Sequence, residues 1–294
     1  MSQLALPLKE LCDVAIEAAQ AAGSLIQSTD RNALQQHFKQ AGSSAASQVV
    51  TELDLRSEAL IRQHLQPSCE EWNIAFVGEE SSQGGREGIP ERLLKPYYWC
   101  VDPLDGTLPF IEGNAGYAVS IALVNQSGVP LMGVICDPVE ATLMHAIKGQ
   151  GAFRGNTPIT PADSLSTSLM VFADASFSKQ EDDDRILNIL NTCAHDSGQG
   201  EVTIVYGSGA VKNASQVLDY PAACYLKLPK PEEGGGSIWD FAATACIVSE
   251  AGGWVSDSYG QALALNREHS TFMNHRGVIY ASNQRIARYL IDRL

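Results

Sequence analysis

The chain begins with apolar residues at three-to-four spacing, which is typical of an amphipathic helix. These residues are Leu8, Leu11, Ala15, Ala22 and Leu25. A second helix is predicted over "VVTELDLRSEALIRQHL", residues 49–65, with Thr51 as its N-cap and Asp54 as the matching acid three residues later. The polar stretch between the two helices, residues 28–48, is expected to form a mobile connection or a hairpin.

Short apolar runs bounded by turn residues follow the second helix. They are "IAFVG" (74–78), "YYWCV" (97–101), "YAVSIALV" (117–124), "LMGVICD" (131–137) and "LMHAIKG" (143–149). The junctions "NQSG" and "KGQG" have the composition of hairpin turns. This half of the chain is therefore predicted to pack helices on an antiparallel sheet.

From about residue 165 the pattern changes to strands that alternate with helices. Strands are predicted at "LMVFADA", "VTIVYGSG", "ACYLKLP" and "GVIYAS", and helices around "RILNILNTC", after "VTIVYGSG", at "IWDFAATACIVSEAGG" and at "RIARYLIDRL". This alternation indicates an α/β arrangement. We therefore predict an α/β fold, with an α+β N-terminal subdomain at residues 1–160 and an α/β C-terminal subdomain at residues 161–294.

The composition supports one large globular unit or two closely packed subdomains, because 45% of the 294 residues are hydrophobic. The charge balance is acidic, with 34 Asp and Glu against 20 Lys and Arg, which gives a formal net charge of −14. Such a surface repels the phosphate backbone of nucleic acids, so we expect no nucleic-acid partner. A small anionic substrate would need local cations or metal ions to neutralise the repulsion.

The seven cysteines are scattered and form no Cys-x-x-Cys pair, and most lie in apolar runs. This usage is typical of reduced cysteines in a reducing compartment, with neither a disulfide framework nor a zinc site. The N-terminal segment lacks the features of a signal peptide, and the chain has no run of about 18 apolar residues, as a membrane-spanning helix would need. We therefore expect a soluble, cytoplasmic protein without a membrane partner.

Acidic residues stand at several predicted strand ends and helix starts. Asp102 and Asp105 lie three apart in "WCVDPLDGTLPF", residues 99–110, and Asp54, Glu79 and Asp240 occupy similar positions elsewhere. Each acid also has a purely structural interpretation. Asp54 would complete a capping box, Glu79 would be solvated after a strand, and Asp240 would favour the positive end of a helix. Asp-Pro and Asp-Gly, at Asp102 and Asp105, are common turn residues.

Together, these acids favour a metal site, because hard cations such as Mg²⁺ bind oxygen ligands and substrate phosphate. Gly106 would let the backbone approach a phosphate closely, and the amides after it would bind phosphate oxygens. The hydroxyl of Thr107 would help to orient water. This set of groups suits metal-assisted hydrolysis of a phosphate ester.

The motifs "GEES", "DPLDGT" and "WDFAATACIVSEAGG", in this order, resemble those of the inositol monophosphatase superfamily of Mg²⁺-dependent, lithium-sensitive phosphatases. "VVTELD" and "GQGAFRGN" are similar to further segments of the family, so the resemblance covers essentially the whole chain. It implies a layered α/β/α/β/α sugar-phosphatase fold, phosphomonoesterase activity and a homodimer.

The resemblance also implies a set of metal ligands. Glu79, Asp102 and the backbone carbonyl of Leu104 would bind the first Mg²⁺. Asp102, Asp105 and Asp240 would bind the second, and a third, weaker ion would lie near Glu79. Two or three ions are thus expected per subunit, and Mn²⁺ is expected to substitute for Mg²⁺.

The remaining roles implied by the resemblance concern water and phosphate. Asp54 and Thr107, hydrogen-bonded to each other, would orient the attacking water as the catalytic residues. The amides of Gly106 and Thr107 would bind the phosphate. Glu80 would lie behind the ligands or in solvent, because the family ligand matches the first acid of the pair.

Two residues favour different substrates. Glu233, seven positions before Asp240, matches an acid that contacts inositol hydroxyls in the monophosphatases; it is otherwise a solvated loop residue. Lys212, in "YGSGAVK", matches a segment of the bisphosphate nucleotidases and would meet a second phosphate; it is otherwise a surface lysine. After "DGT" the chain has Leu-Pro-Phe, which differs from both groups.

We therefore predict hydrolysis of an inositol or related polyol monophosphate. The alternative is a 3′(2′),5′-bisphosphate nucleotidase that acts on adenosine 3′,5′-bisphosphate. A catalytically inactive, metal-binding interaction protein is a third interpretation.

Overall fold

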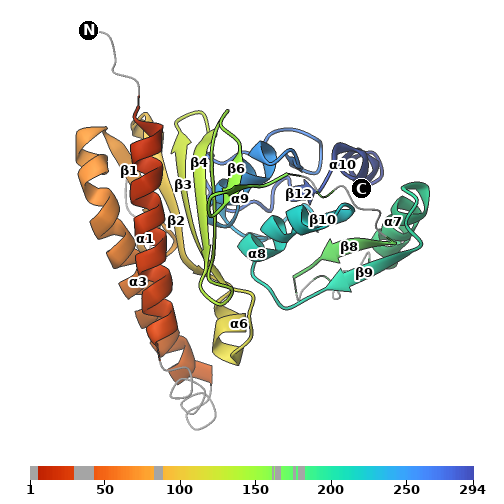
Figure 1. Cartoon of the computed structure of the whole chain (residues 1–294), viewed down its shortest axis with the longest axis horizontal. Helices are drawn as coiled ribbons and strands as arrows, with labels where there is room; N and C mark the ends of the chain where they lie inside the picture. Colours follow the sequence, from red (N-terminus) through yellow and green to blue (C-terminus); the bar gives the residue numbers. More distant parts are fainter. Residues whose placement is uncertain are drawn as a thin grey trace.

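The computed structural model describes residues 6–29, 43–82, 89–160, 162, 167–174, 177 and 183–294, with the backbone alone described at 43–51 and 183. Most of the predicted connection at 28–48 lies outside the described residues. Within these ranges the chain forms five layers, α/β/α/β/α, as predicted (Figure 1).

The first layer consists of α1 (Leu8–Ser28) and α3 (Ser43–Glu71), which cover one face of a seven-stranded sheet. The other face of this sheet packs on α8 (Ala210–Ser215) and α9 (Ile238–Glu250), and a five-stranded sheet packs on the far side of these two helices. The outer layer is formed by α7 (Asp183–Asp196) and α10 (Gln284–Ile291). Short helical segments connect the layers: α4 (Glu79–Ser82), α5 (Glu91–Leu94), α6 (Thr107–Glu112) and the 3₁₀ turn Gln216–Asp219.

The seven-stranded sheet keeps its strands in sequence order. They are β1 (Ile74–Gly78), β2 (Tyr97–Asp105), β3 (Ala118–Asn125), β4 (Pro130–Asp137), β5 (Thr142–Ile147), β6 (Ala152–Arg154) and β7 (Thr157–Pro158). All neighbouring pairs are antiparallel except β1 and β2, which are parallel. The predicted antiparallel sheet is thus confirmed, apart from this one pair.

The five-stranded sheet has the order β11 (Trp254–Ser256), β12 (Val278–Ala281), β10 (Ala223–Lys227), β8 (Ser168–Phe172) and β9 (Glu201–Val205). The strand β8 runs parallel to both β9 and β10, as the predicted alternation of strands and helices requires. The strand β12 returns antiparallel to β10. The short strand β11 was not predicted, since three residues give too little alternation to be recognised.

The predicted start of the second helix is wrong. The helix α3 begins at Ser43, so Thr51 lies inside it and is not its N-cap. The preceding "SSAASQ" has no apolar period but contains alanine and glutamine, which favour helix. Asp54 therefore lies within a continuous helix and does not complete a capping box.

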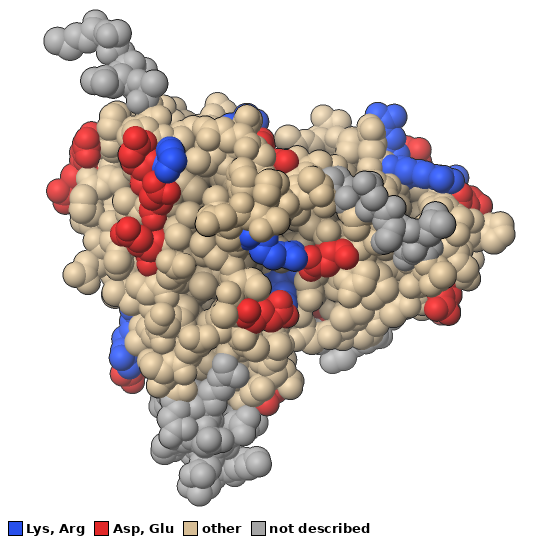
Figure 2. Space-filling model, in the orientation of Figure 1, with Lys and Arg blue, Asp and Glu red and all other residues tan. Residues whose placement is uncertain are grey.

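The described surface is acidic over α1, where Glu10, Asp13 and Glu17 are exposed (Figure 2). No helix in the described ranges combines the length and apolar character needed to cross a bilayer.

The helix α9 is the most deeply buried long helix, because it lies between the two sheets. Its backbone contacts the first sheet directly at Gly133 in β4. A Cβ atom added to this glycine would lie 2.8 Å from Cα of Ala243, which is closer than such atoms approach. Close packing of α9 therefore depends on the missing side chain at Gly133.

We expect Gly133→Ala to lower the free energy of unfolding by about 1–3 kcal/mol, because overpacking a rigid core costs this much. Urea denaturation of the metal-free protein would measure the change. The control is Gly200→Ala, where the added Cβ would lie 3.6 Å from the carbonyl oxygen of Thr167, an ordinary contact. The control should change stability by less than about 0.5 kcal/mol. Equal effects of the two variants would contradict close packing at Gly133.

Candidate active site

A β-bulge at the end of β2 brings Asp102 and Asp105 onto the same face of the sheet. In a regular strand, residues three apart point to opposite faces. Here Asp102 pairs with Ser120 and Asp105 pairs with Ala118, so three steps on β2 match two steps on β3. The extra residue in β2 restores the alternation that aligns the two carboxylates. The predicted turn is thus the bulged end of a strand.

The parallel pairing of β1 and β2 brings Glu79 to the same edge. Gly78, the last residue of β1, pairs with Val101, so Glu79 leaves β1 beside Asp102. The two side chains lie within hydrogen-bonding reach. Because both strands end at this edge, their last side chains meet there.

Asp240 comes from the far side of the site, at the first turn of α9. Ser237 and Asp240 form a capping box, in which the backbone N–H of Ser237 donates to Oδ2 of Asp240 over 3.0 Å. Asp240 therefore has the structural role expected of it at the start of the helix. The capping box uses one carboxylate oxygen, Oδ2, and leaves the other directed toward the aspartates of β2.

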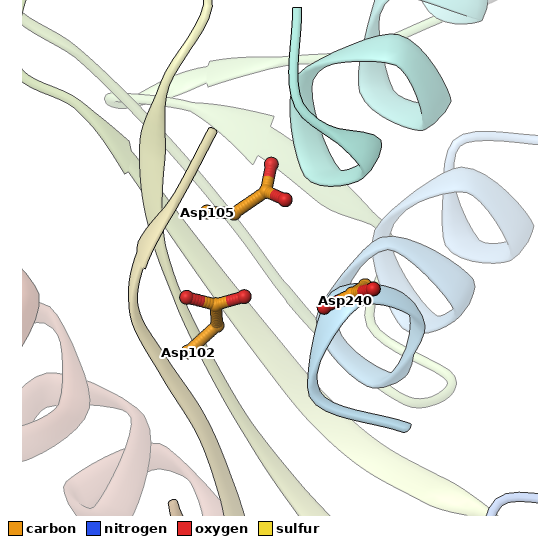
Figure 3. A group of neighbouring side chains, drawn as sticks. All are labelled: Asp102, Asp105 and Asp240. Atoms are coloured by element: carbon orange, nitrogen blue, oxygen red, sulfur yellow. The ribbon is translucent and has the colours of Figure 1, made fainter. Parts of the chain in front are cut away.

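Figure 3 shows Asp102 and Asp105 projecting from β2 toward the helices and Asp240 projecting from α9. One carboxylate oxygen from each residue lies within 4.8 Å of those of the other two. Asp102 is 1% exposed and Asp105 is 8% exposed. Three carboxylates at this spacing can share one or two cations.

Burial and mutual repulsion disfavour the charged forms of these three acids. The pKa of Asp102 is raised well above its usual range, first by burial and then by the charges of Glu79, Asp105 and Asp240. Burial and the charge of Asp240 also raise the pKa of Asp105. Burial raises the pKa of Asp240, although the charge of Lys227 and the Ser237 amide oppose the shift. Without a bound cation, the cluster therefore resists full ionisation.

Asp54 and Glu79 show the same effect. Burial and the charge of Glu80 raise the pKa of Asp54 to about 8. Burial raises the pKa of Glu79 to about 8, together with the charges of Asp240, Glu80 and Asp54. One oxygen of Asp54, Oδ1, is buried without a hydrogen-bond partner.

Glycines let the backbone pack tightly around the bulge. Gly106 has a positive φ of 86°, and a Cβ on it would lie 2.5 Å from the carbonyl oxygen of Gly116. A Cβ on Gly209 would collide with the carboxylate of Asp105. The amide of Gly209 donates to the Gly116 carbonyl over 2.7 Å. The segment that follows β9 is thereby held against the end of β2.

The predicted hydrogen bond between Asp54 and Thr107 is absent from the structure. The hydroxyl of Thr107 donates instead to the carbonyl oxygen of Leu104, over 3.3 Å. Because that carbonyl is a predicted metal ligand, a cation bound to it would compete for the same oxygen.

The two residues predicted to select the substrate differ in their surroundings. Glu233 is exposed in the loop between β10 and α9. Lys212 is buried, and its ammonium group pairs with the carboxylates of Asp137 and Glu140. Both partners belong to the end of β4 and the turn after it, so the interpretation of Lys212 as a surface lysine is wrong.

The cation beside the cluster is Lys227, the last residue of β10, which the sequence reasoning missed. Its charge lowers the pKa of both Asp105 and Asp240. Its ammonium group lies 2.9 Å from the carboxylate of Asp174, which also accepts hydrogen bonds from Tyr225 and Asn213. No sequence signal indicated this position, because it depends on the place of β10 in the second sheet.

A second missed residue, Glu58, supports the turn that carries Glu79. Its buried carboxylate accepts hydrogen bonds from the backbone N–H groups of Glu80 and Ser81, at 2.8 and 3.0 Å. A Cβ on Gly78 would collide with this carboxylate. Glu58 follows Asp54 by four residues in a helix, and this spacing could have revealed it.

The site suits a hard divalent cation. Every candidate ligand is an oxygen, which Mg²⁺ and Mn²⁺ accept. The unpartnered Oδ1 of Asp54 shows that the described residues leave buried acceptor capacity unused. A bound cation would also relieve the repulsion among the acids.

The model of the "Inositol monophosphatase family" matches residues 7–294. "Inositol monophosphatase 2" of Solanum lycopersicum is 33% identical over 258 residues, which cover 88% of this chain and 91% of that protein. "Nus factor SuhB" of Pseudomonas aeruginosa is 32% identical over 266 residues, 89% of this chain and 90% of that protein.

Among solved structures, an inositol monophosphatase from Anabaena (Nostoc) has a similar fold. Its TM-score is 0.70 at 22% identity, and the match covers 98% of both chains. The layered architecture is therefore that of the inositol monophosphatase fold. Because the family model spans nearly the whole chain, this protein belongs to the inositol monophosphatase family, whose members are metal-dependent phosphatases.

Proposed function

We propose that this protein is a Mg²⁺-dependent phosphomonoesterase that hydrolyses an inositol or related polyol monophosphate. The observation that carries the proposal is the cluster of buried Asp102 and Asp105 with half-buried Asp240, and with Glu79 beside it. Such a cluster is stable in its ionised form only with a bound cation.

Five residues would hold two or three Mg²⁺ ions, with Mn²⁺ as a substitute. They are Glu79, Asp102, Asp105 and Asp240 through their carboxylates and Leu104 through its carbonyl oxygen. When bound, the cations would neutralise charge on the phosphate and lower the pKa of water.

Asp54 would accept a proton from the attacking water, because its buried Oδ1 has no partner in the described protein. Thr107 lies at the start of α6 and would orient the same water through its hydroxyl group. This role requires the hydroxyl to exchange its bond to Leu104 for one to the water.

The phosphate would lie against the start of α6. The first N–H groups of a helix have no partner within the helix, so the amides of Gly106 and Thr107 would donate to phosphate oxygens. The tight packing of Gly106 on Gly116 holds these amides in place.

A second candidate function, hydrolysis of a 3′(2′),5′-bisphosphate nucleotide, is favoured by Lys227. Its ammonium group lies near Asp105 and Asp240 and would bind a second anionic group of the substrate. Asp174 holds this lysine in place and could accept a hydrogen bond from a substrate hydroxyl.

Phosphate release from inositol 1-phosphate and from adenosine 3′,5′-bisphosphate would separate the two candidates. With Mg²⁺, we expect faster release from inositol 1-phosphate and inhibition of that release by lithium. The opposite preference would support the second candidate. In that case Lys227→Met should raise KM for the bisphosphate about 10–100-fold, the value of one charge-assisted hydrogen bond.

The matched control is Lys230→Met, which removes an exposed lysine three residues away. It should leave KM for both substrates unchanged. Release from neither substrate, nor from an aryl phosphate, would favour an interaction protein without catalysis.

Asp102→Asn should lower kcat more than about 100-fold, because even residues that only orient metal ligands contribute roughly 10–100-fold. Removal of one buried charge should also raise the Tm of the metal-free protein. Steady-state phosphate release at saturating Mg²⁺ would measure kcat, and thermal unfolding in EDTA would measure Tm. The control Asp196→Asn changes an exposed aspartate on α7 and should alter neither quantity. Retention of full activity by Asp102→Asn would contradict the proposed ligand set.

The metal-free protein should become less stable as the pH rises from 6 to 9. The folded-state pKa values of Asp54 and Glu79, about 8, lie above their ordinary values. Their contribution to stability is therefore fully present below about pH 4 and is lost as the pH rises through 8. Added Mg²⁺ should accordingly raise Tm by at least about 3 °C more at pH 9 than at pH 6. Asp54→Asn should reduce this difference, and an equal Mg²⁺ effect at both pH values would contradict the explanation.

A further inference from the structure

A polar cavity of about 270 Å³ lies between the first sheet and α8, outside the cluster of aspartates. Its walls include Asp137, Glu140, Arg154, Lys212 and Asp219. Figure 2 shows acidic and basic side chains side by side near the middle of the visible face. The five charged side chains of the cavity wall form two separate ion-paired groups, which differ in burial: Lys212 with Asp137 and Glu140, and Arg154 with Asp219.

The inner pair joins Lys212 to Asp137. Both side chains are 8% exposed, and Lys212 also lies 2.9 Å from Glu140. The other oxygen of Asp137 accepts the backbone N–H groups of Val139 and Glu140, at 2.8 and 2.9 Å. The backbone of the turn after β4 therefore holds the carboxylate of Asp137 in place, and this carboxylate holds the ammonium group of Lys212.

The first two residues of α8, which directly precede Lys212, bind Asp105. The backbone N–H of Ala210 donates to one carboxylate oxygen of Asp105 over 3.1 Å, and that of Val211 donates to the other over 2.8 Å. Lys212 is the next residue in α8. The direction of the Asp105 carboxylate thus depends on the position of α8, and the ion pair between Lys212 and Asp137 ties α8 to the end of β4.

We propose that Lys212 and Asp137 are positioning residues that hold α8, and through it the carboxylate of Asp105, in place for the cation. This inference rests on the proposed metal site. It assigns Lys212 a role other than the predicted contact with a second phosphate, since its ammonium group already has two carboxylate partners.

Removal of the lysine should disturb the helix. In Lys212→Met the carboxylates of Asp137 and Glu140 would face the cavity without a cation, and an uncompensated buried charge is strongly unfavourable. Water would enter and α8 would shift, which would change the direction of the two N–H groups on Asp105. Lys212→Arg would keep the charge, and the adjoining cavity has room for the longer side chain.

The test measures binding of Mn²⁺ without substrate, by electron paramagnetic resonance, in four variants of the full chain. We expect Lys212→Met to weaken Mn²⁺ binding about 10–100-fold, as for other residues that orient metal ligands. Lys212→Arg should restore most of the loss. Glu140→Gln, which changes the exposed partner, should have a smaller effect. The control Arg154→Met breaks the outer ion pair with Asp219 and should leave Mn²⁺ affinity unchanged.

Activity assays add a second reading. At saturating Mg²⁺, Lys212→Met should keep KM for the phosphate ester within about threefold while the Mg²⁺ concentration for half-maximal rate rises by the factor found for Mn²⁺. Unchanged Mn²⁺ affinity together with a raised KM for a bisphosphate would overturn the proposal and make Lys212 a substrate contact. An equal loss in Arg154→Met would also overturn it. Failure of the wild-type protein to bind Mn²⁺ would instead refute the metal site itself.

Discussion

Repulsion among buried carboxylates is the constraint on which the rest of this structure depends. Asp102, Asp105 and Asp240 lie within a few ångströms of one another, and burial raises the pKa of each. A protein that only needed stability would not retain such a group, because buried charges without partners destabilise the folded state. The surrounding elements hold the acids together against this repulsion. A bound divalent cation would attract each carboxylate and thereby offset their mutual repulsion.

The scaffold holds these acids by local devices that are individually simple. A bulge aligns two residues of β2, a parallel neighbour brings Glu79 beside them, and a capping box orients Asp240. Each device ties an acid to backbone atoms of a regular element, which is more rigid than a loop. This arrangement requires glycine at three positions. A side chain at Gly106, Gly133 or Gly209 would force these elements apart. The geometry of the site therefore depends on these glycines as well as on the acidic side chains.

The helices and strands could be predicted from the sequence because periods of 3.6 and 2 residues are local properties that need no partner. The order of the layers was implied by the family resemblance. The acids could be singled out because they occur in ordered motifs. The bulge could not be predicted, since it exists only relative to β3. The position of Lys227 beside Asp105 follows from the order of strands in the second sheet, and the ion pair of Lys212 with Asp137 joins segments that only the folded chain brings together. The start of α3 was missed because its first residues carry no apolar period.

The place of α9 between the two sheets has a consequence for biosynthesis. Asp102 and Asp105 are translated early, with the first sheet, whereas Asp240 follows only after most of the second half has been made. A nascent chain on the ribosome thus exposes a partial acidic cluster before the helix that completes it has emerged. Contacts between such distant segments form slowly, because a long loop must close first. A cation that needs all three carboxylates would accordingly bind late in the maturation of the protein, after the two sheets have closed over α9.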